Sequence, residues 1–477
     1  MTKEGNRLDP ANWDDYRKSM HDLLETCLDR LSSARDLPWH PKPDNMGDQV
    51  SLPPMIEPES PDRLFDRISQ DIMPYATGNT HPRFFGWVQG GGSPLGVAAE
   101  LVAATMNSNC GGRDHGATEV ERSVINWLCG LAGLPETAFG ILTSGTSHAT
   151  ILALSAARYR LFGPDIRTKG VKAFPDISLY AAAGAHSCFE KALEVLGYGS
   201  DALRTIPLTG KGQMDLDALQ ARIAADRAAG IAPLAVIATA GSVNTGNFDP
   251  IADLADLCEA EDIWLHVDGA FGFWALLAEA PWSDLCAGIG RVQSIACDFH
   301  KWMSVPYDCG ACLISDSQLH RDTFLSRPSY LESQNSGLGG GDLWFCDYGL
   351  ELSRGFKALK VWATLQGYGT DALGAYVTDN CRQARLMGEL ATASDVLELA
   401  CPVVSNVCCI RPIKGDASAI AARLQLSGEV VFSTTRINGE NCLRAALVNH
   451  RTTSDDIRLA VEAVEREVRC SSQEAKA

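Results

Sequence analysis

Ser294-Ile-Ala-Cys-Asp-Phe-His-Lys-Trp302 and the earlier string His266-Val-Asp-Gly-Ala270 decide the fold class of this chain. Each string contains the end of a short apolar run, followed by an ionisable side chain: Asp268 in one and Lys301 in the other. Short apolar runs separated by helical segments are typical of a mainly parallel sheet with crossover helices. Because the carboxyl ends of parallel strands meet at one edge of the sheet, we expect Asp268 and Lys301 to share one cleft.

The same alternation of apolar runs and helical segments extends over most of the chain between residues 85 and 370. A sheet of six strands is of ordinary size, so we predict an α/β fold for this region. The candidate strands are 139–142, 177–180, 234–239, 263–267, 294–297 and 309–314.

Three domains or parts are expected from this pattern: an N-terminal helical arm at 1–84, a large domain at 85–374 and a small C-terminal domain at 375–477. The arm contains an amphipathic segment at 12–35 and then the proline-rich Pro38-Trp-His-Pro-Lys-Pro43. In the last part, helical segments at 375–390 and 454–468 enclose the short apolar pieces 403–410 and 430–433. That arrangement predicts a small α+β domain.

The composition argues against several kinds of partner. Lys plus Arg is 41 against 59 for Asp plus Glu, which gives a net charge of −18, and no basic stripe offsets it, so nucleic acid is not expected as a partner. The chain has no long uninterrupted apolar stretch and no apolar core of a secretory signal near its start, so we expect a cytoplasmic protein without a membrane span. Its 16 cysteines are scattered and lack zinc spacing; we expect mostly buried thiols and no metal.

A turn that could hold phosphate follows the candidate strand 139–142. Gly145, Thr146 and Ser147 lie between that strand and the helical segment 151–159, so their backbone N–H groups stand at a helix N-terminus. Such a terminus attracts phosphate. Ser and Thr also favour this position simply as helix caps, and the turn alone does not decide between the two readings.

Asp268 and Lys301 have complementary chemistry. A lysine after a buried strand can form a Schiff base with an aldehyde, and an aspartate can hold the protonated nitrogen of a pyridine ring. Together they are what pyridoxal phosphate requires, although Asp268 could also be a solvated residue at a strand end. His300, next to Lys301, must lie in the same cleft.

Three further side chains are candidates with open alternatives. His186 opens a helical segment after the run 177–183 and could lie flat over a planar ring or be a structural histidine. Tyr330 precedes a glycine-rich loop and could be a proton donor on a closing lid, or an anchor. Arg354 could pair with an acidic neighbour or with the phosphate.

As a group, these strings resemble the group II pyridoxal-phosphate decarboxylases, the family of aromatic L-amino acid decarboxylase and glutamate decarboxylase. The resemblance extends from His81-Pro-Arg-Phe-Phe-Gly86 to Asn449-His-Arg-Thr-Thr453. It implies the aspartate aminotransferase-like fold (fold type I), which has a mostly parallel seven-stranded sheet covered by helices on both faces and a small C-terminal domain. It also implies a homodimer with active sites at the subunit interface.

The resemblance implies roles for individual residues. Lys301 would form the Schiff base, Asp268 would hold the pyridine nitrogen and His186 would stack on the ring, with Ala270 beneath it. Tyr330 matches a lid tyrosine that returns a proton to the substrate carbon after CO₂ leaves. The residues implied around the phosphate are Gly145, Thr146, Ser147 and His300. The implied reaction converts an L-amino acid into its amine.

Departures from the family pattern concern the substrate. The family usually has a hydroxyl residue where this chain has Val243, and a second arginine where Gly355 follows Arg354. The segment 109–118 is rich in glycine and charge, whereas aromatic decarboxylases have an apolar wall there. Its Arg113 and His115 could face a polar or acidic substrate, or Arg113 could be tied to Asp114 or Glu119.

Trp87 stands where the family has an aromatic residue of the substrate cleft, and it makes an aromatic amino acid the first choice of substrate. Three alternatives stay open: a decarboxylase of a polar or acidic amino acid, an oxidative enzyme that releases aldehyde, ammonia and peroxide, and a non-catalytic binding protein on the same fold. The oxidative reading is disfavoured because, in the family, such enzymes typically lack the phenol matched by Tyr330.

Overall fold

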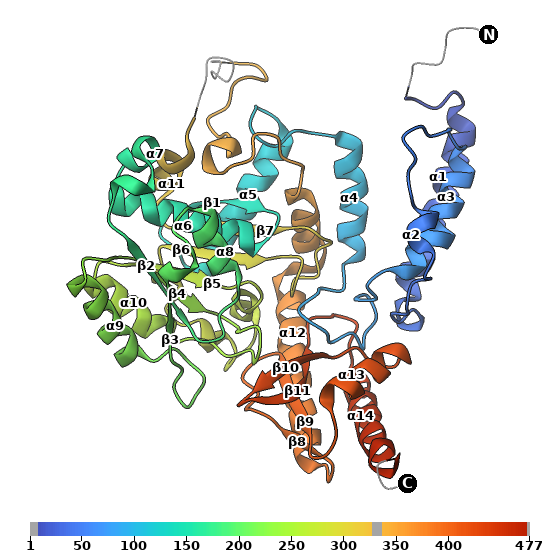
Figure 1. Cartoon of the computed structure of the whole chain (residues 1–477). Helices are drawn as coiled ribbons and strands as arrows, with labels where there is room; N and C mark the ends of the chain where they lie inside the picture. Colours follow the sequence, from blue (N-terminus) through green and yellow to red (C-terminus); the bar gives the residue numbers. More distant parts are fainter. Residues whose placement is uncertain (1–7, 327–335, 475–477) are drawn as a thin grey trace.

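A seven-stranded sheet forms the centre of the larger part of the molecule (Figure 1). The computed structural model describes residues 8–326 and 336–474. The strand order is β1-β7-β6-β5-β4-β2-β3; β7 is antiparallel to both of its neighbours, and the strands from β6 to β3 are parallel. The strands are β1 (Phe139–Thr143), β2 (Ile177–Ala182), β3 (Leu203–Ile206), β4 (Ala232–Thr239), β5 (Trp264–Asp268), β6 (Ser294–Asp298) and β7 (Gly310–Ile314).

The predicted α/β fold with a mostly parallel sheet is confirmed, and each of the six predicted strands corresponds to a strand of the sheet. The prediction missed β3. This strand lies at the edge of the sheet, pairs with β2 alone and buries only Ile206 fully, so it lacks the continuous apolar run that marks the central strands.

Helices cover both faces of the sheet because successive residues of the buried strands point to opposite sides. In β2, Leu179 and Ala181 pack with α6 (Thr146–Phe162) and α8 (Cys188–Val195). Tyr180 and Ala182 face the other core. That second core contains residues of α5 (Gly116–Ala132), α9 (Leu216–Ala228), α10 (Ile251–Ala260) and the first half of α12 (Ala358–Ala393).

A smaller antiparallel sheet, ordered β10-β11-β9-β8, forms the C-terminal part with α13 (Ala417–Leu426) and α14 (Ser454–Glu474). Its strands are β8 (Leu397–Leu399), β9 (Val407–Pro412), β10 (Ser433–Ile437) and β11 (Glu440–Ala446). The long helix α12 joins the two parts, since its end packs in the small core through Ala384, Met387 and Ala391. The predicted domain boundary at 374 falls inside α12, and the division into three parts stays a prediction. The names large domain and small domain denote the parts around the seven-stranded and the four-stranded sheet.

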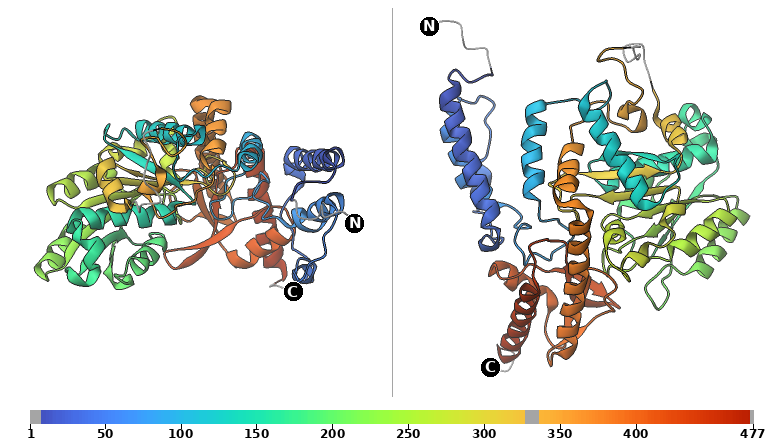
Figure 2. Two further views of the ribbon diagram at one scale, coloured as in Figure 1. Left: turned by 90° about the horizontal axis from the view of Figure 1, so that it is seen from above. Right: turned by 180° about the vertical axis from the view of Figure 1, so that it is seen from behind.

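The N-terminal helices lie at one side of the molecule. Figure 2 shows α1 (Trp13–Ser32) and α3 (Pro61–Arg67) outside α4 (Pro94–Met106) and away from the large sheet. No residue of α1 or α3 is fully buried. Within the described part of the chain, no helix combines the length and the apolar character needed to span a membrane.

One buried carboxylate connects the N-terminal segment to the small domain. Asp456 accepts a hydrogen bond of 2.7 Å from Arg35, and its other oxygen accepts the Thr453 amide and hydroxyl before the first turn of α14. Arg83 lies 3.4 Å from the same carboxylate. Burial alone would raise the pKa of Asp456, but the hydrogen bonds from Arg35 and Thr453 hold its pKa below that of an ordinary aspartate.

We expect Asp456→Asn to lower the free energy of unfolding at pH 7 by about 1.5–3 kcal/mol, because hydrogen bonds to a charged group are lost. A carboxyl whose pKa is lowered by folding stabilises the protein above its unfolded-state pKa of about 3.9, and the effect is lost as the pH falls through the folded-state value. Urea denaturation at several pH values checks this. A variant that is equally destabilised in acid would contradict the electrostatic account.

Candidate active site

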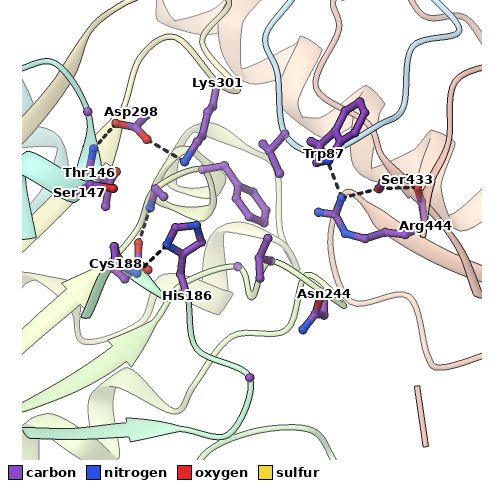
Figure 3. A pocket seen from close by; sticks show the side chains of 18 of the residues that line it. Trp87, Thr146, Ser147, His186, Cys188, Asn244, Asp298, Lys301, Ser433 and Arg444 are labelled. Carbon is purple, nitrogen blue, oxygen red and sulfur yellow. Dashed lines mark hydrogen bonds and ion pairs between the residues drawn. The ribbon is translucent and has the colours of Figure 1, made fainter. Parts of the chain in front are cut away.

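A cavity of about 800 Å³ opens at the carboxyl ends of the parallel strands, between the large sheet and the small domain (Figure 3). The large domain supplies the first turn of α6, the turn before α8, and the ends of β5 and β6. The small domain supplies residues of α13 and β10, together with Arg444 of β11. Crossover topology therefore brings together side chains that are far apart in the sequence.

Most of the residues predicted to form the site line this one cavity. They are Trp87, Gly145, Thr146, Ser147, His186, Asp268, Ala270, His300 and Lys301. Among the described residues, the lining does not include Arg113, His115 or Arg354. Tyr330 lies outside the described residues. The cavity thus contains the whole set proposed to hold a cofactor. Of the other candidates Trp87, Arg113, His115 and Arg354, it contains Trp87.

Lys301 stands on a short turn between β6 and β7, and this turn is firmly held. The amides of Phe299 and His300 both donate to the carbonyl of Cys309, and the indole of the buried Trp302 donates to Asn380. The Lys301 ammonium points into the cavity and lies 2.8 Å from a carboxylate oxygen of Asp298 (Figure 3). A rigid turn thus presents a primary amine to the cavity, which is what Schiff-base formation requires.

Asp268 ends β5 and is almost fully buried at the cavity wall. One of its oxygens accepts the Ala270 amide at 3.1 Å. Burial raises the pKa of Asp268, and the charge of Lys301 opposes that rise. A buried carboxylate of this kind gains from a cationic partner in the cavity, and the protonated nitrogen of a pyridine ring is such a partner.

The first turn of α6 carries polar atoms that lack partners in the protein. In the described structure the Thr146 hydroxyl and Nε2 of His148 are buried without a hydrogen bond. The Thr146 amide is already used, since it donates to Asp298 at 2.7 Å. An anion bound at this turn, which also contains Ser147, would satisfy the unpaired Thr146 hydroxyl and His148 Nε2, so the residues fit the phosphate of pyridoxal phosphate.

His186 lies on the turn before α8, where the cavity wall passes from β2 to the helix (Figure 3). Its Nδ1 accepts the Cys188 amide at 3.1 Å, so the proton of the neutral ring resides on Nε2. This hydrogen bond fixes the orientation of the ring inside the cavity. The arrangement is compatible with a ring that stacks on a planar cofactor.

Asp298 and Arg444 are charged residues of the site that had no role in the sequence analysis. Asp298 stands three positions before Lys301 in the quoted string, and that spacing was the signal that could have revealed it. Arg444 was a single cation in the apolar run Cys442-Leu-Arg-Ala-Ala446. The structure buries Arg444 to 3% exposure, with one nitrogen donating to the Trp87 carbonyl and to the Ser433 hydroxyl.

The guanidinium of Arg444 has no carboxylate partner in the described structure, and its Nε and Nη2 are unsatisfied. Burial lowers the pKa of Arg444 to about 10. Isolated buried charges are costly, and an unpaired cation on a cavity wall indicates a site for an anionic group of a ligand.

The remaining candidates have structural contacts within the chain. Arg354 is buried and forms two hydrogen bonds with Glu121, at 2.6 and 3.0 Å. Of its two predicted partners, an acidic neighbour and the phosphate, it therefore has the acidic neighbour. Arg113 lies with its guanidinium 4.4 Å above the Trp344 ring. His115 is 3.1 Å from the Asn109 carbonyl. None of these contacts supports a role in substrate binding.

Comparison with known proteins is consistent with this geometry. Residues 43–411 match the model of the pyridoxal-dependent decarboxylase conserved domain. The chain is 30% identical to an aromatic-L-amino-acid decarboxylase of Bacillus atrophaeus, over 86% of this chain and 87% of that protein. It is also 30% identical to an L-2,4-diaminobutyrate decarboxylase of Rhizobium meliloti, over 77% and 74%. A crystal structure of Oryza sativa TDC with PLP and tryptamine superposes with a TM-score of 0.87 at 25% identity, covering 97% of this chain and 99% of that one.

Proposed function

Because the chain belongs to the family of pyridoxal-dependent decarboxylases, it is a pyridoxal-phosphate-dependent carboxy-lyase, and we propose that its substrate is an aromatic L-amino acid. The observation that carries the catalytic part of the proposal is the presence of Lys301 and Asp268 in the lining of one cavity. The substrate part is supported by Trp87, whose half-exposed ring lines the same cavity, and by the aromatic decarboxylase among the relatives.

When bound, pyridoxal phosphate supplies an aldehyde that joins to amines and a ring that takes up the electron pair released at the substrate Cα. In the proposal, Lys301 provides the resident amine and Asp268 keeps the ring nitrogen protonated. His186 and Ala270 hold the two faces of the ring. Ser147, Thr146, His148 and the adjoining Gly145 and His300 hold the phosphate.

Arg444 is proposed to bind the α-carboxylate of the substrate. Its unsatisfied Nε and Nη2 are charge-assisted donors, and a carboxylate accepts two such bonds in a planar arrangement. Because Nη1 is held by the Trp87 carbonyl and the Ser433 hydroxyl, the guanidinium is already oriented. A fixed carboxylate and a fixed ring define the angle of the Cα bonds, and this orientation selects loss of CO₂ over other reactions at Cα.

Tyr330 is proposed to return a proton to Cα after CO₂ leaves. If that proton were not delivered, oxygen could react with the electron-rich carbon and give aldehyde, ammonia and peroxide, which is the oxidative alternative. A polar substrate is the other alternative; it is supported by the diaminobutyrate decarboxylase among the relatives. No contact of Arg113 or His115 with the cavity supports it within the described part of the chain.

We also propose that the protein is a homodimer in which α4 contributes to the interface. The sequence of α4, Pro-Leu-Gly-Val-Ala-Ala-Glu-Leu-Val-Ala-Ala-Thr-Met, contains one charged residue. Its apolar side chains Leu95, Val97, Leu101, Val102 and Met106 are 37% to 50% exposed. An apolar helix with so much exposed surface is best explained by a second copy of the chain that covers it.

The first expected outcome concerns the products. The purified protein with pyridoxal phosphate and a panel of L-amino acids should release an amine and CO₂ in equal amounts, without peroxide, and fastest from an aromatic substrate. Lys301→Ala should show no turnover, whereas Lys211→Ala, which removes an exposed lysine outside this cavity, should be unaffected. Peroxide with aldehyde would support the oxidative reading, and turnover by Lys301→Ala would refute the assignment of the lysine.

A second outcome concerns Arg444. Arg444→Met should raise KM by about 10- to 100-fold, because a charge-assisted pair with the substrate carboxylate is lost. The free energy of unfolding should stay unchanged or rise, because an uncompensated buried charge is removed. Steady-state kinetics and urea denaturation measure the two effects. Arg436→Met, in the same small sheet but partnered with Asn441, is the control, and an unchanged KM in Arg444→Met would contradict the role.

A third outcome concerns assembly. Light scattering should give a mass twice that of the 51.3 kDa chain, and Leu101→Asp should shift it toward the single-chain value because a charge is placed in an apolar interface. Leu459→Asp, at an equally exposed leucine of α14, should leave the mass unchanged. A native protein with the mass of one chain would refute the dimer.

A further inference from the structure

Asp298 is the charged residue that pairs with Lys301, and the proposed function assigns no role to Asp298. We propose that Asp298 is the counter-ion that receives the Lys301 ammonium each time a substrate amine displaces the lysine from the cofactor. The residue would in this way favour exchange of the lysine for the substrate. The proposal rests on the proposed function, because it requires Lys301 to be the lysine that joins the cofactor.

Contacts to both of its oxygens hold the carboxylate of Asp298 in place. It is 2% exposed, and its two oxygens accept from different partners: Oδ1 from the Thr146 amide at 2.7 Å and Oδ2 from the Lys301 ammonium at 2.8 Å. Its own carbonyl accepts the indole N–H of Trp274 at 2.9 Å. A Cβ at Gly310 would lie 2.5 Å from Oδ1, so only glycine there leaves room for the carboxylate.

Lys301 is the positive charge that this carboxylate pairs with. His300 is the other base nearby, with Nε2 at 3.8 Å from Oδ2 of Asp298, and its Nδ1 is held by the backbone of Cys309, at 2.9 Å from the carbonyl oxygen and 3.1 Å from the amide nitrogen. Burial lowers the pKa of His300, so its ring is neutral at pH 7. The Thr146 amide adds the positive end of the α6 dipole. The further titratable groups that face this ion pair are Asp268 of β5, His186 and Cys188 at the start of α8, and Tyr307 after the lysine turn.

The proton balance of the exchange explains why a counter-ion is useful. An amino acid arrives with its nitrogen as an ammonium group, which carries three protons. In the exchange, the bond from Nζ of Lys301 to the aldehyde carbon breaks and a bond from the substrate nitrogen to that carbon forms. Two protons pass from the substrate nitrogen to Nζ, so Lys301 leaves as an ammonium ion and no external base or water is consumed. Asp298 stabilises that product more than the state before the exchange, because Nζ bonded to the aldehyde carbon carries a single proton and shares its positive charge with the cofactor.

The same charge should delay capture of the cofactor, because only an unprotonated amine adds to an aldehyde. An opposite charge in contact favours the charged form of an amine over the neutral form that reacts. Neutralising Asp298 should therefore have two opposite effects. Capture of the cofactor becomes easier at neutral pH, and displacement of the lysine by a substrate amine becomes harder. A merely structural role would not produce this pair of changes.

Asp298→Asn tests the proposal, since the amide oxygen can still accept the Thr146 amide and only the charge is lost. Cofactor-free protein is mixed with pyridoxal phosphate, and the growth of its visible absorption band is followed from pH 6 to pH 9. The variant should capture the cofactor about tenfold faster or more at pH 7, with the half-maximal rate at a lower pH. L-Tryptophan methyl ester has an amine but no carboxylate to lose, and it changes the visible absorption band when its amine displaces Lys301. The variant loaded with pyridoxal phosphate should require an ester concentration about tenfold higher for half of this change.

Asp249→Asn is the matched control, because Asp249 is also buried and accepts two backbone amides, those of Met214 and Thr239, without contacting Lys301. If Asp298→Asn does not fold, Asp298→Ser with added formate is used, and formate should slow cofactor capture by this variant but not by the native protein. Native values of both the pH profile and the ester titration in a folded Asp298→Asn would overturn the inference. A native protein that forms no visible band with pyridoxal phosphate would instead refute the proposed function.

Discussion

The close approach of the first turn of α6 to the ends of β6 and β7 is the constraint on which the rest of the site depends. The hydrogen bond from the Thr146 amide to Asp298 joins the helix to β6, and Gly310 at the start of β7 gives the space for it, since a Cβ there would lie 2.7 Å from the Gly145 Cα. A helix N-terminus held at this place provides the unpaired donors that suit a phosphate. The turn that follows β6 then carries Lys301 into the same cavity.

Charge placement gives the cavity its chemistry. Its large-domain side holds two buried carboxylates, Asp268 and Asp298, with the Lys301 ammonium against the second of them. The small-domain side presents the buried guanidinium of Arg444 without an acidic partner. The unpaired guanidinium of Arg444 would be costly in a protein that bound nothing, because an isolated buried charge loses hydration without compensation. The same arrangement suits a zwitterionic amino acid beside a cofactor with a basic ring nitrogen and a phosphate.

Arg354 and Glu121 show how a charged pair can serve the fold and not the ligand. Their side chains are buried and linked by two hydrogen bonds, and Arg354 also donates to the carbonyls of Cys110 and Leu142. Glu121 accepts the Leu142 amide in return. The pair therefore fastens α5 and the segment before α12 to β1, the strand that leads into the phosphate turn. In sequence, an arginine of this kind looks the same as one that binds a ligand.

The sequence by itself determined the α/β class, the central strands and which residues line the proposed cofactor half of the cavity, because apolar runs that end in Asp268 or Lys301 report both burial and chemistry. It also contained signals that were not used: Asn438 and Gly439, both with positive φ in the two-residue turn between β10 and β11, are a hairpin signature. Only the tertiary structure decided that Arg444 faces the cavity while Arg354 and Arg113 do not, and that Asp298 contacts Lys301. The physical reason is that the partner of a buried charge is set by packing between segments remote in sequence, which local patterns of residues do not encode.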